Sequence, residues 1–406
     1  MYDLLNSFWA FLLTIPIIIY LIVNHRDQKL VAYFLLAYTL RCILMVCDLN
    51  RAFTIPHSGG DTEMLHWISR QNFIYNTNKV FTNYTVVLTL IYRISDGSRA
   101  LAQYFNVIMG MGVLAYLVES MKLLKINKKT MHNILLLAAL MPQLIILSCI
   151  LLREAWIHLF LTMSVYYFIR WFLGNKGGSK NIVYCLLCVL AATWMHNGCI
   201  AIFVGYAMAF LFYNPIKKTN SFSYRSVISA ILLLGFVTFY AANADVLSSK
   251  FSRYEGMDSS EVFLARANTR TISGSEYLIW LPKTSNLFVA LLFSPLKVFY
   301  FLFAPIPLDW RGPADMIAFI MDSTIYIYLF WKLVTLRISI AWARQMRKYL
   351  LVAYITIVFM FAYGTNVSGT AIRHRAKSVP VLFLAYALAG SYGSYAPINS
   401  NRRRRR

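Results

Sequence analysis

The chain has 406 residues, of which 59% are hydrophobic and only 14% are charged, and its mean hydropathy is +0.57. This composition excludes a water-soluble globular protein of this size, so lipid must be the main solvent. A formal net charge of +23 would suit a nucleic-acid-binding protein. The basic residues, however, lie in short loops between apolar segments, where they act as orientation signals, and we do not expect nucleic acid as a partner.

Apolar stretches of roughly 20 residues, the length that crosses a hydrocarbon core, recur along the whole chain. The first lacks a basic start and a small-residue cleavage site, so we expect a retained helix and no removed signal peptide. The predicted spans are Leu5 to Val23, Leu30 to Val46, Leu101 to Met121, Met131 to Leu151, Ala155 to Leu173, Ile182 to Trp194, Cys199 to Phe212, Val227 to Ala242, Met316 to Val334, Tyr349 to Tyr363 and Ser378 to Tyr392. The sequence therefore predicts an all-α fold, a single polytopic transmembrane bundle.

Two further apolar stretches, Val80 to Ile94 and Leu287 to Ala304, could be either crossings or re-entrant or interfacial segments. Counting them as crossings would place basic loops on both sides of the bilayer, so we predict about 11 spanning helices plus these two segments. One face then holds 22 of the 39 Lys and Arg, which makes it cytoplasmic and places the N-terminus outside. The Arg402 to Arg406 tail is also predicted to be cytoplasmic.

The opposite, extracytoplasmic face receives the predicted loops 47–79, 243–284 and 364–377, and most of the acidic residues. The first loop carries Asp61 and Glu63, either of which could remove a proton from a sugar hydroxyl. A solvated turn in which Glu63 begins a helix is the alternative.

Leu152-Arg153-Glu154 interrupts a long apolar run, and an ionisable pair at a helix junction is costly unless it is neutralised or used. Adjacent helical residues point about 100° apart, which favours separate partners for Arg153 and Glu154. His196 lies at a predicted turn on the same face, where an imidazole could act as a base, bind phosphate or fill the turn.

The long outer loop carries Arg266 and Arg270, which could reach an anionic headgroup or lie in solvent. The last outer loop, Gly364 to Arg375, is a glycine-, serine- and threonine-rich turn that ends in Arg373, His374 and Arg375. Guanidinium groups form bidentate, charge-assisted bonds to phosphate oxygens, so this loop predicts an anion site at the two arginines.

The order of these features resembles the EpsG and Wzy-type bacterial polysaccharide polymerases, which are multi-spanning GT-C-like glycosyltransferases. The shared features are the outer Gly-Gly-Asp61 loop, Leu-Arg153-Glu154-Ala at a helix junction, and Ala-Ala-Thr-Trp-Met-His196 at a helix end. The resemblance implies an enzyme of the bacterial inner membrane that polymerises undecaprenyl-pyrophosphate-linked repeat units of a surface polysaccharide such as an O-antigen, a capsule or an exopolysaccharide. A chain-length regulator would be a further partner.

By the same resemblance, Arg373 and Arg375 would hold the diphosphate with help from Arg153, and the candidate bases are Asp61, Glu63, His196 and His374. The sequence shows no cluster of metal ligands and no cofactor motif, so arginine would stabilise the leaving group. Two alternatives remain open, a GT-C transferase with a polyprenyl-phosphate sugar donor and a lipid-linked sugar transporter. The absence of an internal repeat argues against the transporter.

Overall fold

The computed structural model describes residues 2–174, 178–221, 224–243, 258–268, 276–278 and 281–395. Most of these residues are helical. In chain order the α-helices are α1 (Tyr2–Val23), α2 (Gln28–Leu49), α3 (Gly60–Tyr75), α4 (Asn83–Ser95), α5 (Arg99–Leu123), α6 (Lys128–Leu140), α7 (Pro142–Cys149), α8 (Glu154–Phe172), α9 (Gly178–Met195), α10 (Ile202–Phe212), α11 (Tyr224–Ala242), α13 (Ser259–Ala267), α14 (Leu287–Leu292), α15 (Ser294–Phe303), α16 (Pro313–Ala318), α17 (Thr324–Thr335), α18 (Ala341–Tyr363), α19 (Ser368–Ala376) and α20 (Val379–Tyr392).

Short elements complete the fold. They are the 3₁₀ turns η1 (Asn197–Ala201) and η3 (Pro307–Asp309), the π-helical turn η4 (Phe319–Ser323), and the strands β1 (Tyr213–Asn214), β2 (Thr219–Asn220), β3 (Leu336–Ile338) and β4 (Gly393–Tyr395). β1 pairs with β2, and β3 pairs with β4, both antiparallel.

Within the described residues, six helical stretches are long and apolar enough to cross a membrane. They are Leu5–Val23, Gln28–Leu49, Arg99–Leu123, Gly178–Met195, Pro313–Thr335 and Ala341–Tyr363. α6 and α7 together make a seventh candidate, bent by 50° at their junction. The prediction of a helical membrane protein is thus confirmed by these spans, and each coincides with a span expected from the sequence. The full count of eleven stays a prediction, because helices such as α10 and α20 are shorter.

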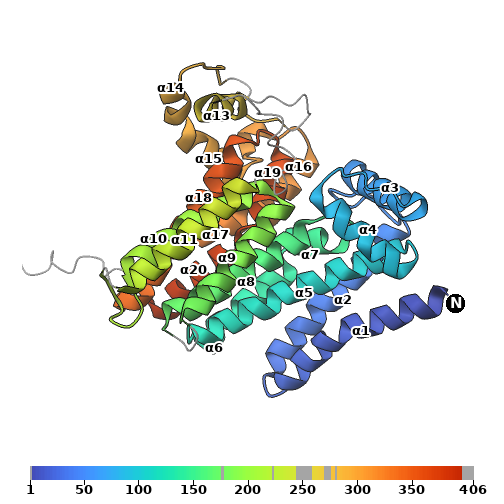
Figure 1. Ribbon diagram of the computed structural model, residues 1–406, viewed down its shortest axis with the longest axis horizontal. Helices are drawn as coiled ribbons and strands as arrows, with labels where there is room; N and C mark the ends of the chain where they lie inside the picture. Colours follow the sequence, from blue (N-terminus) through green and yellow to red (C-terminus); the bar gives the residue numbers. More distant parts are fainter. Residues whose placement is uncertain are drawn as a thin grey trace, which may run out of the picture.

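The basic loops lie together at one end of the bundle. Lys122 Nζ donates to Asn24 Oδ1 over 2.6 Å, and Tyr392 donates its hydroxyl to the Leu124 carbonyl over 2.8 Å. The pairing of β3 with β4 joins the loop before α18 to the end of α20. In Figure 1, α6 begins at this end, while α3, α13, α14, α16 and α19 lie at the other. These contacts bring three of the predicted basic loops and the end of α20 to one end of the bundle, and the side of the membrane that this end faces stays a prediction.

α4 begins and ends at the same end of the bundle, opposite the basic loops. Near its start, Asn83 Nδ2 donates to the Trp194 carbonyl over 2.7 Å. Just after its end, Arg99 begins α5 and pairs with Glu63 at 2.8 Å. These contacts describe a short helix that enters and leaves on one side, as expected of a re-entrant or interfacial segment.

α14 and α15 behave in the same way. Tyr363, the last residue of α18, donates its hydroxyl to the Ala290 carbonyl over 3.0 Å, and Arg375 Nη1 donates to the Ala304 carbonyl over 2.8 Å. Tyr363 and Arg375 flank the same outer loop, so the start and the end of this hairpin lie at one end of the bundle.

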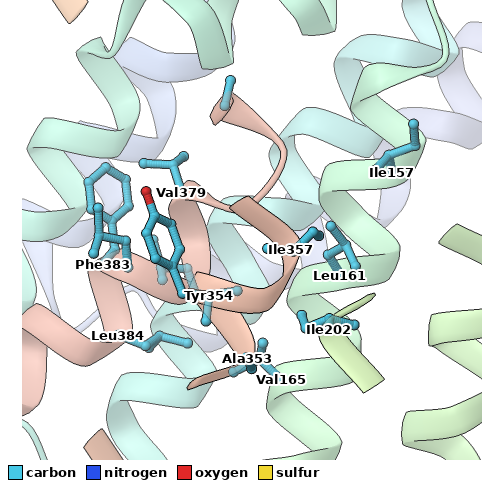
Figure 2. Close-up of a cluster of buried hydrophobic side chains, with 14 of the residues drawn as sticks. Ile157, Leu161, Val165, Ile202, Ala353, Tyr354, Ile357, Val379, Phe383 and Leu384 are labelled. Carbon is cyan, nitrogen blue, oxygen red and sulfur yellow. The ribbon is translucent and has the colours of Figure 1, made fainter. Parts of the chain in front are cut away.

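The core below that end is formed by α8, α10, α18 and α20. Figure 2 shows Ile157 and Leu161 of α8 facing Ile357 of α18, with Val379 and Phe383 of α20 on the other side of α18. α10 approaches α18 so closely that a Cβ atom added at Gly205 would lie 2.4 Å from the Ala353 backbone nitrogen. A small residue at this crossing is what close helix packing in lipid requires.

Arg41 is the most unusual residue within a predicted span, because it is fully buried in α2. Its guanidinium donates to Ser148 Oγ (3.0 Å) and to the carbonyls of Ala37 (3.0 Å) and Leu144 (3.4 Å). Among the described residues it makes no ion pair with a carboxylate. Its contacts join α2 to α7, which is a structural role.

Candidate functional site

The break between α7 and α8 delivers Glu154 to the end of the bundle that lacks the basic loops. The chain leaves the helical path at Ile150, and the carbonyls freed by the break would be costly in an apolar setting. Asn106 of α5 satisfies two of them, because its Nδ2 donates to the carbonyls of Ile150 (2.7 Å) and Leu152 (2.9 Å). Trp156 Nε1 holds the Asn106 amide by donating to its Oδ1 over 2.8 Å. Glu154 then occupies the first turn of α8, where the helix dipole favours a carboxylate.

α19 directs two cations at this carboxylate. Arg373 and Lys377 are four residues apart and therefore share a helix face. Arg373 Nε lies 2.7 Å and Lys377 Nζ lies 3.7 Å from Glu154 Oε1. The Glu154 and Lys377 side chains are 0% exposed, whereas that of Arg373 is 16% exposed. Glu154 is thus a buried carboxylate held by two cations, of which only Arg373 reaches the surface.

α3 adds a second carboxylate on the open side of Arg373. Arg373 Nη1 lies 2.8 Å from Asp61 Oδ2, and the Asp61 side chain is 55% exposed. Gly59 has a φ of +140°, a backbone conformation that residues with a side chain rarely adopt. In the same turn, Ser58 Oγ donates to Asp48 Oδ1 over 2.6 Å. This anchored turn before α3 fixes where Asp61 lies.

Glu63 does not join Asp61. Residues two apart on a helix point about 200° apart, and Glu63 pairs instead with Arg99 at 2.8 Å. Arg99 also lies 3.9 Å from Asp48. Glu63 therefore belongs to a neighbouring group that ties α3 to α2 and α5.

The two candidate histidines meet over one aromatic ring. The ring centroids of His196 and His374 are 5.1 Å apart, and each lies 5.0 Å from the Phe361 ring. Thr365 Oγ1 lies 3.4 Å from His374 Nδ1. Gly198 makes this approach possible, because a Cβ atom there would lie 2.6 Å from the Phe361 ring.

Burial and the charges around the site together shift three pKa values. Burial by itself opposes ionisation of Glu154, but Arg373, Lys377 and Arg153 together hold its pKa well below the usual range. Burial lowers the pKa of Lys377 to about 7, although Glu154 favours the charged ammonium. Burial, together with the nearby cations, also lowers the pKa of His374. At neutral pH, Glu154 is therefore an anion and His374 a neutral imidazole.

Arg153 precedes Glu154 at the start of α8 and contributes to the field that keeps Glu154 ionised. In the part of the chain that the structure describes, its guanidinium makes no hydrogen bond or ion pair. Arg153 and Glu154 thus do not pair with each other, as expected because adjacent helical residues point about 100° apart. Arg153 is thus a cation beside the site whose donors are not committed to another side chain.

Arg375 lies on the other face of α19 and is not part of this cluster. It is completely buried and forms an ion pair with Asp322 of η4. Its Nη1 donates to the carbonyls of Phe301 (3.2 Å), Leu302 (2.9 Å) and Ala304 (2.8 Å). The sequence prediction that Arg373 and Arg375 hold one ligand together does not fit this geometry, because α19 separates the two side chains by about 200°.

Arg266 lies apart from the cluster, where it lines a small cavity of about 20 Å³. Lys297, Tyr277, Tyr363 and Thr365 also line this cavity. Arg266 Nη1 donates to Met360 Sδ over 3.7 Å. Arg270 and the Arg402 to Arg406 tail lie outside the described residues.

Three residues near the site were missed by the sequence interpretation: Lys377, Asn106 and His57. The spacing of four residues between Arg373 and Lys377 could have identified Lys377, because on a helix this spacing places both side chains on one face. The sequence interpretation did not expect a helix at residues 368–376. Burial and the adjacent Arg373 lower the pKa of His57, which places this imidazole next to the cluster. Asn106 lies inside an apolar span and has no distinguishing pattern.

In comparisons with known proteins, no family model, no curated protein and no solved structure matches the chain.

Proposed function

We propose that the protein is a membrane glycosyltransferase that polymerises undecaprenyl-pyrophosphate-linked repeat units at the extracytoplasmic face of the bacterial inner membrane. The observation that carries the proposal is the convergence of Arg153, Arg373 and Lys377 around Glu154, at the bundle end without basic loops. With Asp61 included, and with Lys377 protonated, as it is at a pH below its pKa of about 7, three cations face two carboxylates. The cluster therefore has a formal surplus of one positive charge for an anionic ligand.

The surface of the cluster is suited to a diphosphate. Arg373 is held on its open side by the exposed Asp61. Arg153 donates no hydrogen bond to any of the described residues, so its donors can meet a ligand. Guanidinium groups bind phosphate oxygens through paired, charge-assisted hydrogen bonds. The apolar helices around the cluster would keep the polyprenyl chain of such a substrate in lipid while its diphosphate meets the arginines.

In the proposed reaction, a hydroxyl oxygen at the non-reducing end of one lipid-linked glycan attacks the anomeric carbon of another. The bond between that carbon and the diphosphate oxygen breaks, and the electron pair leaves with the carrier diphosphate. Arg373 and Arg153 stabilise the charge that develops on this leaving group. Asp61 takes the proton of the attacking hydroxyl, because it is the carboxylate of the cluster that solvent reaches.

This assignment gives Glu154, Glu63 and Arg375 supporting roles. Glu154 is a poor base, since its neighbours hold it ionised, and we assign it to orienting Arg373. Glu63 is committed to Arg99. Arg375 is assigned to holding α15 and η4 against α19, which leaves Arg153 and Arg373 as the diphosphate-binding pair.

The test is extension of a lipid-linked repeat unit by the purified protein, with product length read on a gel. We expect a ladder from the wild type and none from Arg373→Ala or Arg153→Ala. Arg93→Ala is the matched control, because Arg93 is an exposed arginine at the same end of the bundle that donates to Asn76 Oδ1 over 3.0 Å. It should extend normally.

Other outcomes identify the alternatives. Addition of one sugar from a polyprenyl-phosphate donor would replace polymerisation with a monomeric-sugar transferase. Movement of the intact lipid-linked glycan across a vesicle membrane, without extension, would indicate a transporter. Equal ladders from wild type and Arg373→Ala would refute the role of the cluster.

A further inference from the structure

In the structure, Arg373 is committed to carboxylates on two sides. Its Nε lies 2.7 Å from Glu154 and its Nη1 lies 2.8 Å from Asp61. A diphosphate that recruits this guanidinium must draw it away from at least one of them. Asp61 is more than half exposed and can be solvated by water when Arg373 leaves. Glu154 has no access to water.

An ionised carboxylate that loses its counter-ion inside a protein loses several kcal/mol of stabilisation. Without a second cation, Glu154 would therefore either keep Arg373 or become protonated. Both outcomes would weaken ligand binding or make it depend on a proton. The site needs a positive charge that stays with Glu154 when Arg373 turns outward.

We infer that Lys377 is this reserve counter-ion, a positioning residue that holds Glu154 ionised while Arg373 binds the anionic ligand. The inference rests on the proposed function. Lys377 Nζ lies 3.7 Å from the same Glu154 oxygen that Arg373 contacts, and 5.0 Å from the centroid of the Phe361 ring.

The burial of Lys377 supports this role. Its side chain is 0% exposed, and its Nζ has no hydrogen bond within the described residues, so it does not bind ligand at the surface itself. When Arg373 moves, the lysine can close the remaining gap to Glu154 and form a hydrogen bond. Arg153, by contrast, makes no ion pair with Glu154 in the described structure. The spacing of four between Arg373 and Lys377 lets one helix supply both the mobile and the fixed cation.

The test uses the full-length protein in detergent, at a pH below the Lys377 pKa of about 7 so that its ammonium is protonated. Inorganic pyrophosphate is the probe, and its affinity is measured by calorimetry. Lys377→Met should weaken pyrophosphate binding at least about tenfold, because removing one member of a buried ion pair leaves the other uncompensated. Glu154→Gln removes the need for a counter-ion. Glu154→Gln and the double variant Glu154→Gln/Lys377→Met should therefore bind pyrophosphate equally well.

A second readout separates this role from a general loss of structure. In the Lys377→Met complex, Glu154 should take up a proton, which infrared difference spectra report as a protonated carboxyl band. The band should be absent from the wild type and from the double variant. A variant that merely disturbs packing would not produce it.

The outcomes are distinct. Equal affinity of wild type and Lys377→Met overturns the inference and leaves the proposed function intact. A double variant weaker than Glu154→Gln also overturns it, and this comparison is available even when Lys377→Met alone fails to fold. A wild type that binds no pyrophosphate overturns the proposed function and the inference with it.

Discussion

Replacing Asp322 with Asn tests whether Arg375 is a structural residue or a ligand-binding one. The guanidinium of Arg375 is completely buried, and Asp322 is its carboxylate partner, with Nε 2.7 Å from Oδ2. Its other donors reach the carbonyls of Phe301, Leu302 and Ala304. The substitution keeps the shape of the side chain and one acceptor oxygen but removes the negative charge.

The expected cost is large. Removing one partner of a buried ion pair destabilises a protein by about 3–5 kcal/mol, because the remaining charge is left uncompensated. The retained amide oxygen and the three carbonyls place Asp322→Asn near the lower end, at about 3 kcal/mol. Against a total stability of roughly 5–15 kcal/mol, this is a substantial fraction.

The assay is unfolding by SDS in mixed micelles, which gives a free energy of unfolding for each variant. Adding Arg375→Met to Asp322→Asn removes the uncompensated charge, so the double variant should be less destabilised than the sum of the two single variants. Strict additivity, or a loss below about 0.5 kcal/mol for Asp322→Asn, would show that the pair is not an electrostatic unit. Arg375 would then be available for the ligand after all.

Three further predictions concern the cluster and the core. Asp61→Asn should lower kcat about 100-fold or more in the extension assay, as expected for loss of a general base. KM should stay the same or fall, because the Asp61 carboxylate no longer competes with the substrate for Arg373. A rise in KM with kcat unchanged would contradict this role. Gly205→Val should destabilise the protein by at least about 1–3 kcal/mol in the same SDS titration, since the valine side chain would collide with Ala353. The control is Gly235→Val in α11, at an exposed position where a Cβ atom meets nothing within 4 Å, and it should not show this loss. The pKa of Lys377 falls from its ordinary 10.5 to about 7 on folding, so between these values the unfolded chain binds more protons than the folded one. The free energy of unfolding of the wild type, relative to that of Lys377→Met, should therefore rise with pH across this window. A difference that does not change with pH would show that folding does not lower the pKa of Lys377.

Much of the helical architecture follows from the apolar pattern. The spans that coincide with α1, α2, α5, α9 and α18 were predictable because lipid requires about 20 apolar residues for each crossing. The positions of α6 and α7 were predictable as well. The bend between them was not, although Pro142 begins α7, because a proline at a helix start and a proline at a kink look alike in sequence.

The site was only partly predictable, for reasons of geometry. The predicted topology placed Arg153, Glu154 and Arg373 on one face of the bilayer but did not indicate that Glu154 pairs with Arg373. Interpreting Gly364 to Arg375 as an irregular turn concealed the helix that begins at Ser368, and with it the fact that Arg373 and Lys377 share a face while Arg375 does not. Asp322 was overlooked because a single acid within an apolar span shows no partner until the fold is known.

The segments that begin and end at one end of the bundle have a mechanical consequence. α3 and α4, together with α14 and α15, add polypeptide to that end and contribute nothing to the opposite end. In a bilayer, the protein would displace more area from the leaflet that contains the charged cluster than from the other leaflet. A molecule of such wedge shape stores less elastic energy where the membrane curves to accommodate its wide end. Its distribution within a membrane would then follow the local curvature of that membrane.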